Sequence, residues 1–414
     1  MRALTHREFI RRIPKTDLHV HLDGSLRPGT LIELAREQKV KLPSYDPEGL
    51  RELVFKDAYA DLAEYLRGFA YTTAVLRRAE ALERVAFELA EDNLGEGVRY
   101  IEVRFAPQLH VNRHLSVHDV LRAVARGLDR AKRRHNATAA VQRGEDLPFE
   151  YGLIACAMRS FHSQMSPYYR RLLEVLREAP RKEAFAIASL EMARAAVEAR
   201  DRNGLPVVGF DLAGEEAGYP ASDHRAAYQY AHTRFLKKTV HAGEAYGPES
   251  IFHAITYCHA NRIGHGTFLF AHEMVRDPAI HDPAAYVNRL AEYIASERIT
   301  IEVCLTSNLQ TAPSIRHVED HPLRRMIENE LSVTICTDNR LMSNTTVSKE
   351  LERVIRYMSP TSRQFRNLVV AGFKGSFYPG PYREKRAYVR RAINRYEALE
   401  REWTGEKAGH TKRR

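Results

Sequence analysis

The stretch Thr16-Asp17-Leu18-His19-Val20-His21 opens a pattern that recurs along this chain of 414 residues. Each occurrence is a short run of β-branched and apolar residues, which is the composition typical of a buried strand. Segments with helical periodicity lie between the runs, for example at 82–94, 117–135, 184–201 and 283–297. Parallel strands need helical crossovers on the outside of their sheet, so the alternation predicts a (β/α)₈ TIM barrel. The eight expected strands cover residues 16–21, 98–105, 151–158, 207–212, 239–241, 262–264, 300–304 and 333–337.

Two connections are longer than a barrel requires. The segment 22–97 predicts several helices over the C-terminal mouth, and the Arg- and Glu-rich segment 159–206 predicts an added surface helix. We see no linker that would divide the chain, so we expect one domain over residues 1–414 with a core at about 14–358. The segment 382–403 predicts an amphipathic C-terminal helix followed by a polar tail.

The composition is that of a soluble globular protein, with 44% apolar and 28% charged residues. The four cysteines form no Cys-x-x-Cys motif and are expected to be buried thiols. We find no secretory leader and no membrane-spanning run, so we expect a cytoplasmic protein without a membrane partner. Residues 383–414 hold 11 Lys/Arg and 5 Glu, so this segment carries +6 of the chain's formal net charge of +10. A basic helix of this kind is expected to be solvated, with no nucleic-acid partner.

Residues able to bind a metal stand at the ends of several expected strands. In such barrels the active site lies at the C-terminal ends of the strands. His19 and His21 end the first strand, and their i, i+2 spacing turns both side chains to the same face. The fifth and sixth strands end in His241 and His265, and Asp338 follows the eighth. A single histidine at a strand end is usually a core residue, but this convergence predicts a metal site. Imidazole and carboxylate ligands with an open position suit a Zn²⁺ ion that activates water.

Short motifs stand at or near the ends of the expected strands. In chain order they are Thr16-Asp17-Leu18-His19-Val20-His21-Leu22-Asp23-Gly24-Ser25-Leu26, Glu102-Val103-Arg104-Phe105, Met158-Arg159, Asp211-Leu212-Ala213-Gly214-Glu215, His241-Ala242-Gly243-Glu244, Arg262-Ile263-Gly264-His265-Gly266 and Thr337-Asp338-Asn339. Taken in this order, the motifs resemble the adenosine deaminases over residues 14 to about 358. The resemblance implies one zinc ion per chain and hydrolytic deamination of adenosine, and of 2′-deoxyadenosine, to inosine and ammonia.

The resemblance also assigns the metal ligands and the catalytic groups. Glu244 corresponds to the acid that protonates purine N1, a role that requires a carboxyl group with a raised pKa. His265 corresponds to the residue that orients and deprotonates the attacking water. The expected zinc ligands are His19, His21, His241 and Asp338.

Three further positions match groups that contact the nucleoside. Gly214 corresponds to the residue whose backbone N–H meets purine N3. Asp23 corresponds to the carboxylate that accepts from a ribose hydroxyl, and relatives acting on free adenine tend to carry Glu there. Asn339 departs from the family, which often has a second Asp at this position to donate to N7. Since an amide always carries N–H donors, Asn339 is expected to fill that role without a pKa shift.

A helix face is expected to cover the purine. Four residues at i, i+3, i+4 and i+7 spacing form this face, and the resemblance places them in a lid: Leu62, Tyr65, Leu66 and Phe69.

Three alternatives differ in what they require of the sequence. The same chemistry on adenine, a nucleotide or an aminodeoxyfutalosine-like nucleoside stays open, and a nucleotide would call for Arg or Lys near the mouth. Base-flipping deaminases need a Pro-Cys-x-x-Cys motif, which this chain lacks. A barrel kept only as a binding module should have lost a ligand or the acid, and none is missing here.

Overall fold

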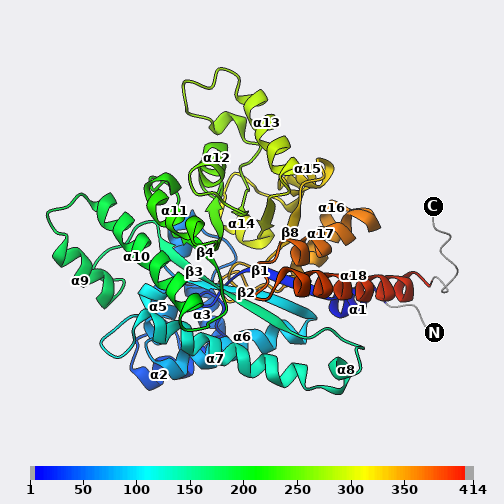
Figure 1. The fold of residues 1–414 in the computed structure, drawn as a ribbon, viewed down its shortest axis with the longest axis horizontal. Coiled ribbons are helices and arrows are strands. Elements are labelled where there is room, and N and C mark those ends of the chain that lie inside the picture. Colours follow the sequence, from blue (N-terminus) through cyan, green and yellow to red (C-terminus); the bar gives the residue numbers. More distant parts are fainter. Residues whose placement is uncertain (1–4, 406–414) are drawn as a thin grey trace.

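The computed structural model describes residues 5–405 (Figure 1). At its centre, parallel strands pair in chain order to form an eight-stranded sheet. Backbone hydrogen bonds close the sheet, because His21 N donates to Asp338 O (2.7 Å) and Asp338 N donates to His19 O (2.8 Å). The strands are β1 (Lys15–His21), β2 (Val98–Phe105), β3 (Glu150–Met158), β4 (Val207–Ala213), β5 (Lys237–Ala242), β6 (Arg262–His265), β7 (Thr300–Val303) and β8 (Val333–Ile335).

The predicted barrel is therefore confirmed, and every strand end lies within about two residues of its expected position. The helices surround the barrel, and the several helices expected between β1 and β2 are present. The helices are α1 (His6–Arg12), α2 (Pro28–Gln38), α3 (Pro47–Leu53), α4 (Leu62–Leu66), α5 (Phe69–Val75), α6 (Ala79–Gly95), α7 (Val117–Asn136), α8 (Ala139–Gln142), α9 (Pro167–Val175), α10 (Arg181–Asp201), α11 (Arg225–Thr233), α12 (Pro248–Thr256), α13 (Pro283–Ser296), α14 (Leu305–Thr311), α15 (Leu323–Glu328), α16 (Val347–Met358), α17 (Ser362–Gly375) and α18 (Tyr382–Thr404).

The segment 159–206 holds both the helix expected at 184–201 and an added surface helix. Helix α10 packs on β3, β4 and α11 as the crossover between β3 and β4. Its buried face consists largely of small residues, including Ala188, Ala193 and Ala196. The addition is α9, which projects from the left edge in Figure 1 and has Tyr169 as its buried residue.

Helix α17 covers the amino-terminal end of the barrel. A Cβ atom at Gly372 would lie 1.9 Å from Thr16 Oγ1 and 2.7 Å from Thr334 Oγ1, so only glycine allows this approach. Thr16 and Thr334 stand near the starts of β1 and β8. Substrate access is therefore left to the opposite, carboxyl-terminal end.

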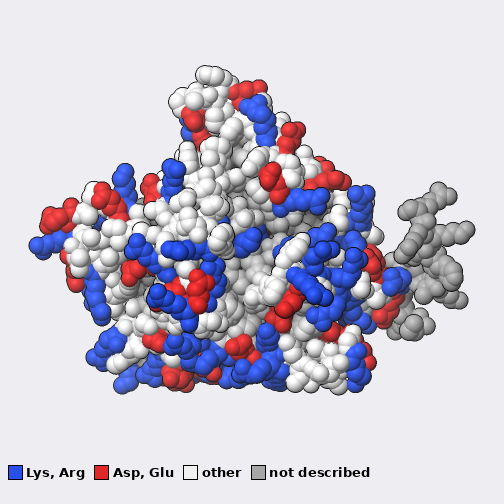
Figure 2. All heavy atoms as spheres, viewed as in Figure 1, with Lys and Arg blue, Asp and Glu red and all other residues white. Residues whose placement is uncertain are grey.

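The C-terminal helix was predicted correctly, and α18 lies beside α1 (Figure 1). Arg12 Nη1 contacts Glu402 Oε1 at 2.8 Å between these two helices. Lys and Arg side chains gather over α17 and α18 in Figure 2. The basic tail expected at 406–414 lies outside the described residues. Over the described range, no helix is both long and apolar enough to cross a membrane.

Candidate active site

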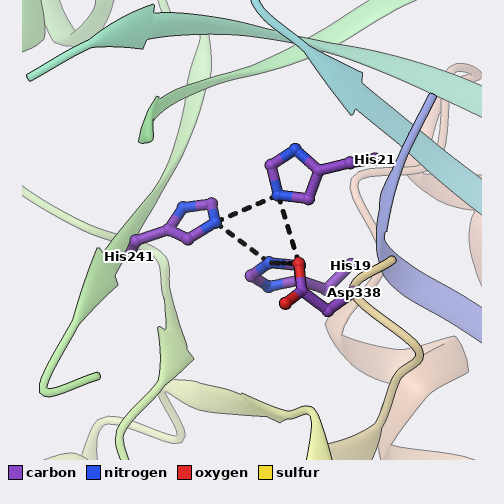
Figure 3. Close-up of side chains that lie close together, drawn as sticks. All are labelled: His19, His21, His241 and Asp338. Carbon is purple, nitrogen blue, oxygen red and sulfur yellow. Dashed lines mark hydrogen bonds and ion pairs between the residues drawn. The ribbon is translucent and has the colours of Figure 1, made fainter. Parts of the chain in front are cut away.

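Four side chains converge at the carboxyl-terminal mouth of the barrel (Figure 3). His19 and His21 come from β1, His241 comes from β5, and Asp338 follows β8. The Nε2 atom of His241 lies 3.1 Å from the Nε2 atoms of both His19 and His21. Asp338 Oδ1 lies 3.5 Å and 3.4 Å from the same two nitrogens. Ligands about 2.0–2.1 Å from a tetrahedral zinc ion are separated by about 3.3–3.4 Å, so these spacings suit such an ion.

The hydrogen bonds of His19 and His241 indicate that the cluster requires a cation. His19 Nδ1 lies 2.9 Å from Glu302 Oε2, and His241 Nδ1 lies 3.0 Å from Asp211 Oδ2. Ionised carboxylates only accept hydrogen bonds, so both Nδ1 atoms carry hydrogen, and in the neutral rings both Nε2 atoms present lone pairs. Two lone pairs at 3.1 Å, with a carboxylate oxygen beside them, repel one another. A cation between them removes this conflict, so the donor set fits a metal.

Arg104 joins the two supporting carboxylates beneath the cluster. Its Nη1 donates to Asp211 Oδ2 and its Nη2 to Glu302 Oε2, each at 2.8 Å. Burial favours the neutral acids, but the contact with His241 and the charge of Arg104 outweigh it and hold the pKa of Asp211 well below its usual value. Against the same burial, Arg104 and Arg262 lower the pKa of Glu302. Both carboxylates therefore stay ionised and fix the orientation of the histidine rings.

Glu244 and His265 form a second group of polar side chains at the mouth. Glu244 Oε1 lies 3.6 Å from His265 Nε2, and both side chains are buried. Burial, followed by the charges of Asp338 and Glu216, raises the pKa of Glu244 well above its usual value. Burial and the neighbouring His19 lower the pKa of His265 well below its usual value. The arrangement therefore favours a protonated carboxyl group beside a neutral imidazole.

A cavity of about 900 Å³ opens above these side chains. This volume is near the upper end of the range of about 300–1,000 Å³ found for ligand sites. Three buried polar atoms of residues that line it have no hydrogen-bond partner among the described residues: Asp23 Oδ1, His265 Nε2 and Asn339 Oδ1. All seven residues predicted to contact the substrate line this cavity, namely Asp23, Leu62, Tyr65, Leu66, Phe69, Gly214 and Asn339.

The expected lid is made of two short helices and not of one. Helix α4 ends at Leu66, and α5 begins at Phe69 after a turn at Arg67 and Gly68. The hydroxyl of Tyr65 accepts from Asn339 Nδ2 (2.8 Å) and lies 3.0 Å from Ser343 Oγ. The lid therefore contacts the strand end that carries Asn339, a link that helical spacing alone does not reveal.

Comparison with known proteins agrees with this geometry. The family model described as adenosine deaminase matches residues 14–392. Adenosine deaminase 1 of Streptomyces coelicolor is 36% identical over 407 residues, which cover 97% of this chain and 92% of the relative. Adenosine deaminase of Mycobacteroides abscessus is 37% identical over 374 residues, covering 89% and 92%. The chain belongs to the adenosine deaminase family. It is thus an enzyme of the hydrolase class that acts on C–N bonds.

Solved structures of other proteins share the fold at lower identity. A zinc-bound amidohydrolase from Burkholderia ambifaria superposes with a TM-score of 0.73 at 19% identity, covering 97% of this chain and 96% of its own. An Arabidopsis protein called ADAL, in complex with IMP, has a TM-score of 0.71 at 24% identity, covering 95% and 99%. Adenine deaminase of Arthrobacter aurescens has a TM-score of 0.68 at 23% identity, covering 92% and 98%.

Sequence reasoning missed several polar residues that support this deaminase site. Glu216 accepts from four consecutive backbone N–H groups, those of residues 243–246, at 2.6–2.9 Å. Glu302 holds His19, and Asn308 and His321 lie behind His265. A carboxylate inside the apolar run 300–304 was the available signal for Glu302. Nothing in the spacing of Asn308 and His321 points to His265.

Proposed function

We propose that this protein hydrolyses adenosine and 2′-deoxyadenosine to inosine and ammonia, with one zinc ion per chain. The ion would be held by His19, His21, His241 and Asp338. One observation carries this proposal. The cluster of three histidines and Asp338, which fits a metal ion, lies at the same cavity as Glu244, a buried carboxyl group with a raised pKa. When bound, zinc would activate a water molecule for attack at neutral pH.

The side chains around the cavity have distinct roles in this proposal. The protonated carboxyl of Glu244 gives its proton to purine N1, which makes C6 more electrophilic. Gly214, with φ of 101°, adopts a conformation that glycine tolerates, and its N–H would meet N3. The free Asp23 Oδ1 would accept from a ribose hydroxyl, and Asn339 would donate to N7.

A direct assay tests the proposed reaction. Purified, zinc-loaded protein is mixed with adenosine, 2′-deoxyadenosine, adenine or adenosine 5′-monophosphate, and the loss of absorbance near the adenosine maximum is followed. The two nucleosides should react, and adenine should not. Elemental analysis of the same sample should give one zinc ion per chain. Full activity in metal-free, chelated protein would contradict the role of zinc.

One observation favours a second candidate, an adenosine nucleotide. Arg67, Arg77 and Arg181 line the cavity, and their guanidinium groups have no ion pair within residues 5–405. Three cations at a substrate cavity suit a 5′-phosphate. If kcat/KM for the monophosphate exceeds that for adenosine, and Arg181→Ala removes the difference, the nucleotide is the substrate. If adenosine is preferred in both proteins, the first proposal stands.

A further inference from the structure

A chain of hydrogen bonds begins outside the cavity at the start of α15. The backbone N–H of Leu323 donates to His321 Nδ1 at 3.0 Å. A backbone N–H cannot accept, so His321 Nδ1 is the nitrogen that bears the lone pair. Burial lowers the pKa of His321 to about 3, so the ring is neutral. The hydrogen of this neutral ring is therefore on Nε2.

The next residue in the chain is Asn308 of α14, which is buried. His321 Nε2 lies 3.3 Å from Asn308 Oδ1, an oxygen that accepts the Nε2 hydrogen. This contact fixes which way the amide group points. Its nitrogen, Nδ2, then faces His265 Nδ1 at 2.9 Å. Because an amide nitrogen only donates, His265 Nδ1 must accept, and the neutral ring of His265 carries its hydrogen on Nε2.

We infer that Asn308 and His321 are positioning residues that hold His265 as its Nε2–H tautomer. His265 Nε2 has no hydrogen-bond partner in the described part of the chain, and it lines the cavity 3.6 Å from Glu244 Oε1. His265 then donates a hydrogen bond to the oxygen that attacks C6 and does not remove a proton from it. This inference rests on the proposed deamination, and it replaces the expected role of His265 as a base.

The proton balance of the attack follows from this tautomer. Glu244 first gives its proton to N1 and becomes a carboxylate. As the oxygen of water bonds to C6, an O–H bond of that water breaks, and its proton returns to the Glu244 carboxylate. His265 keeps its Nε2 hydrogen throughout and stabilises the charge on the oxygen. The ring of His265 cannot take up a second proton without turning an Nδ1–H donor toward the amide N–H of Asn308.

Neutron diffraction locates the hydrogens directly. Crystals of the zinc-loaded wild-type protein are exchanged into D₂O at neutral pD, without substrate. We expect deuterium on Nε2 of both His265 and His321, and not on their Nδ1 atoms. Deuterium on His265 Nδ1, alone or on both nitrogens, overturns the inference. Since this measurement needs no turnover, it is independent of whether adenosine is the substrate.

A substitution then tests the function of the tautomer. In Asn308→Asp a carboxylate faces His265 Nδ1 and draws the ring hydrogen onto that atom, so Nε2 can no longer donate. We expect kcat to fall on the order of 10²-fold, as for loss of a donor to a developing oxyanion, with KM nearly unchanged and zinc retained. Asn93→Asp is the matched control, because Asn93 is also a fully buried amide but lies in α6, outside the cavity lining.

The two variants separate the possible outcomes. The control should keep wild-type kcat even if it loses stability. An Asn308→Asp enzyme with full kcat would overturn the inference while leaving the proposed deamination intact. A wild-type protein without any deaminase activity would instead contradict the proposed function, and the neutron result would still report the tautomer.

Discussion

Glu244 shows how its surroundings give a carboxyl group the properties of a general acid. It is 5% exposed, and burial together with the charges of Asp338 and Glu216 raises its pKa well above the usual value. At neutral pH it can therefore hold the proton that purine N1 requires. We predict that Glu244→Gln, which cannot deliver this proton, lowers kcat by roughly 10²–10⁴-fold while zinc content is unchanged. Steady-state kinetics and elemental analysis check this. Turnover above about a tenth of wild type would mean that another residue is the acid.

Asn339 can be tested by changing the atom that it is expected to contact. One N–H of its amide donates to the Tyr65 hydroxyl, which leaves the other N–H for purine N7. In 7-deazaadenosine a C–H group replaces N7, so a buried donor is left unpaired at a cost of roughly 1–3 kcal/mol. The wild-type enzyme should therefore favour adenosine over this analogue, and Asn339→Ala should reduce that preference. If the ratio of the two kcat/KM values is the same in both enzymes, Asn339 does not contact N7.

At the scale of single elements, the turn after β5 depends on one buried carboxylate. Glu216 accepts from the backbone N–H groups of residues 243–246 and from the Ser250 hydroxyl. In Glu216→Gln an NH₂ group would face some of these donors, and the turn that positions Glu244 should shift. We predict a loss of about 1–3 kcal/mol in unfolding free energy and a fall in kcat of at least about tenfold. Urea unfolding and steady-state kinetics provide the two measurements.

A buried carboxylate on the neighbouring helix provides the control for Glu216. Glu249 in α12 accepts from the backbone N–H groups of Arg276 and Asp277 at 2.6–3.1 Å, and it does not line the cavity. Glu249→Gln should cost similar stability but leave kcat near the wild-type value. If both variants lose stability and neither loses kcat, Glu216 supports the fold and not the position of Glu244.

The elements that could be predicted from the sequence are those with local signals. Runs of β-branched residues located all eight strands, and residues at the strand ends indicated the metal cluster, because parallel strands bring their carboxyl ends together. The helix expected at 184–201 is present as α10, which begins three residues earlier, at Arg181. The lid was expected to be one helix because the break at Gly68 does not change the i, i+3, i+4, i+7 spacing of its apolar residues.

The buried residues that hold the active-site histidines could be identified only from the three-dimensional structure. Asp211 lies 30 positions from His241, and Glu302 lies 283 positions from His19, so no local pattern pairs them. Their pairing depends on how the strands are ordered around the barrel. The same holds for Asn308, which reaches His265 from the helix after β7, 43 positions away. Sequence patterns thus identified groups at the strand ends, but not the buried partners that set their protonation.

At the scale of the whole molecule, two buried histidines outside the metal cluster couple stability to pH. Burial lowers the pKa of both His224 and His321 to about 3, whereas an unfolded histidine titrates near ~6.5. Between these values each of the two histidines binds a proton in the unfolded chain and not in the native protein, so its contribution to the unfolding free energy rises with pH in this window and is lost on acidification. Glu244, whose pKa is raised, holds its proton in the native state and contributes in the opposite direction.

His224 allows this coupling to be measured without disturbing the residues behind His265. Its Nδ1 lies 2.7 Å from Ser189 Oγ, and a glutamine amide can replace that contact without taking up a proton. Between pH 6.5 and 5.0, a histidine with these two pKa values contributes at most about 1.6 kcal/mol to the loss of unfolding free energy. Urea unfolding over this range should therefore show a shallower pH dependence in His224→Gln than in wild type. The exposed His281→Gln should follow the wild-type curve, because its ring meets water in both states. Parallel curves for His224→Gln and wild type would show that the native protein protonates His224 as readily as the unfolded chain does.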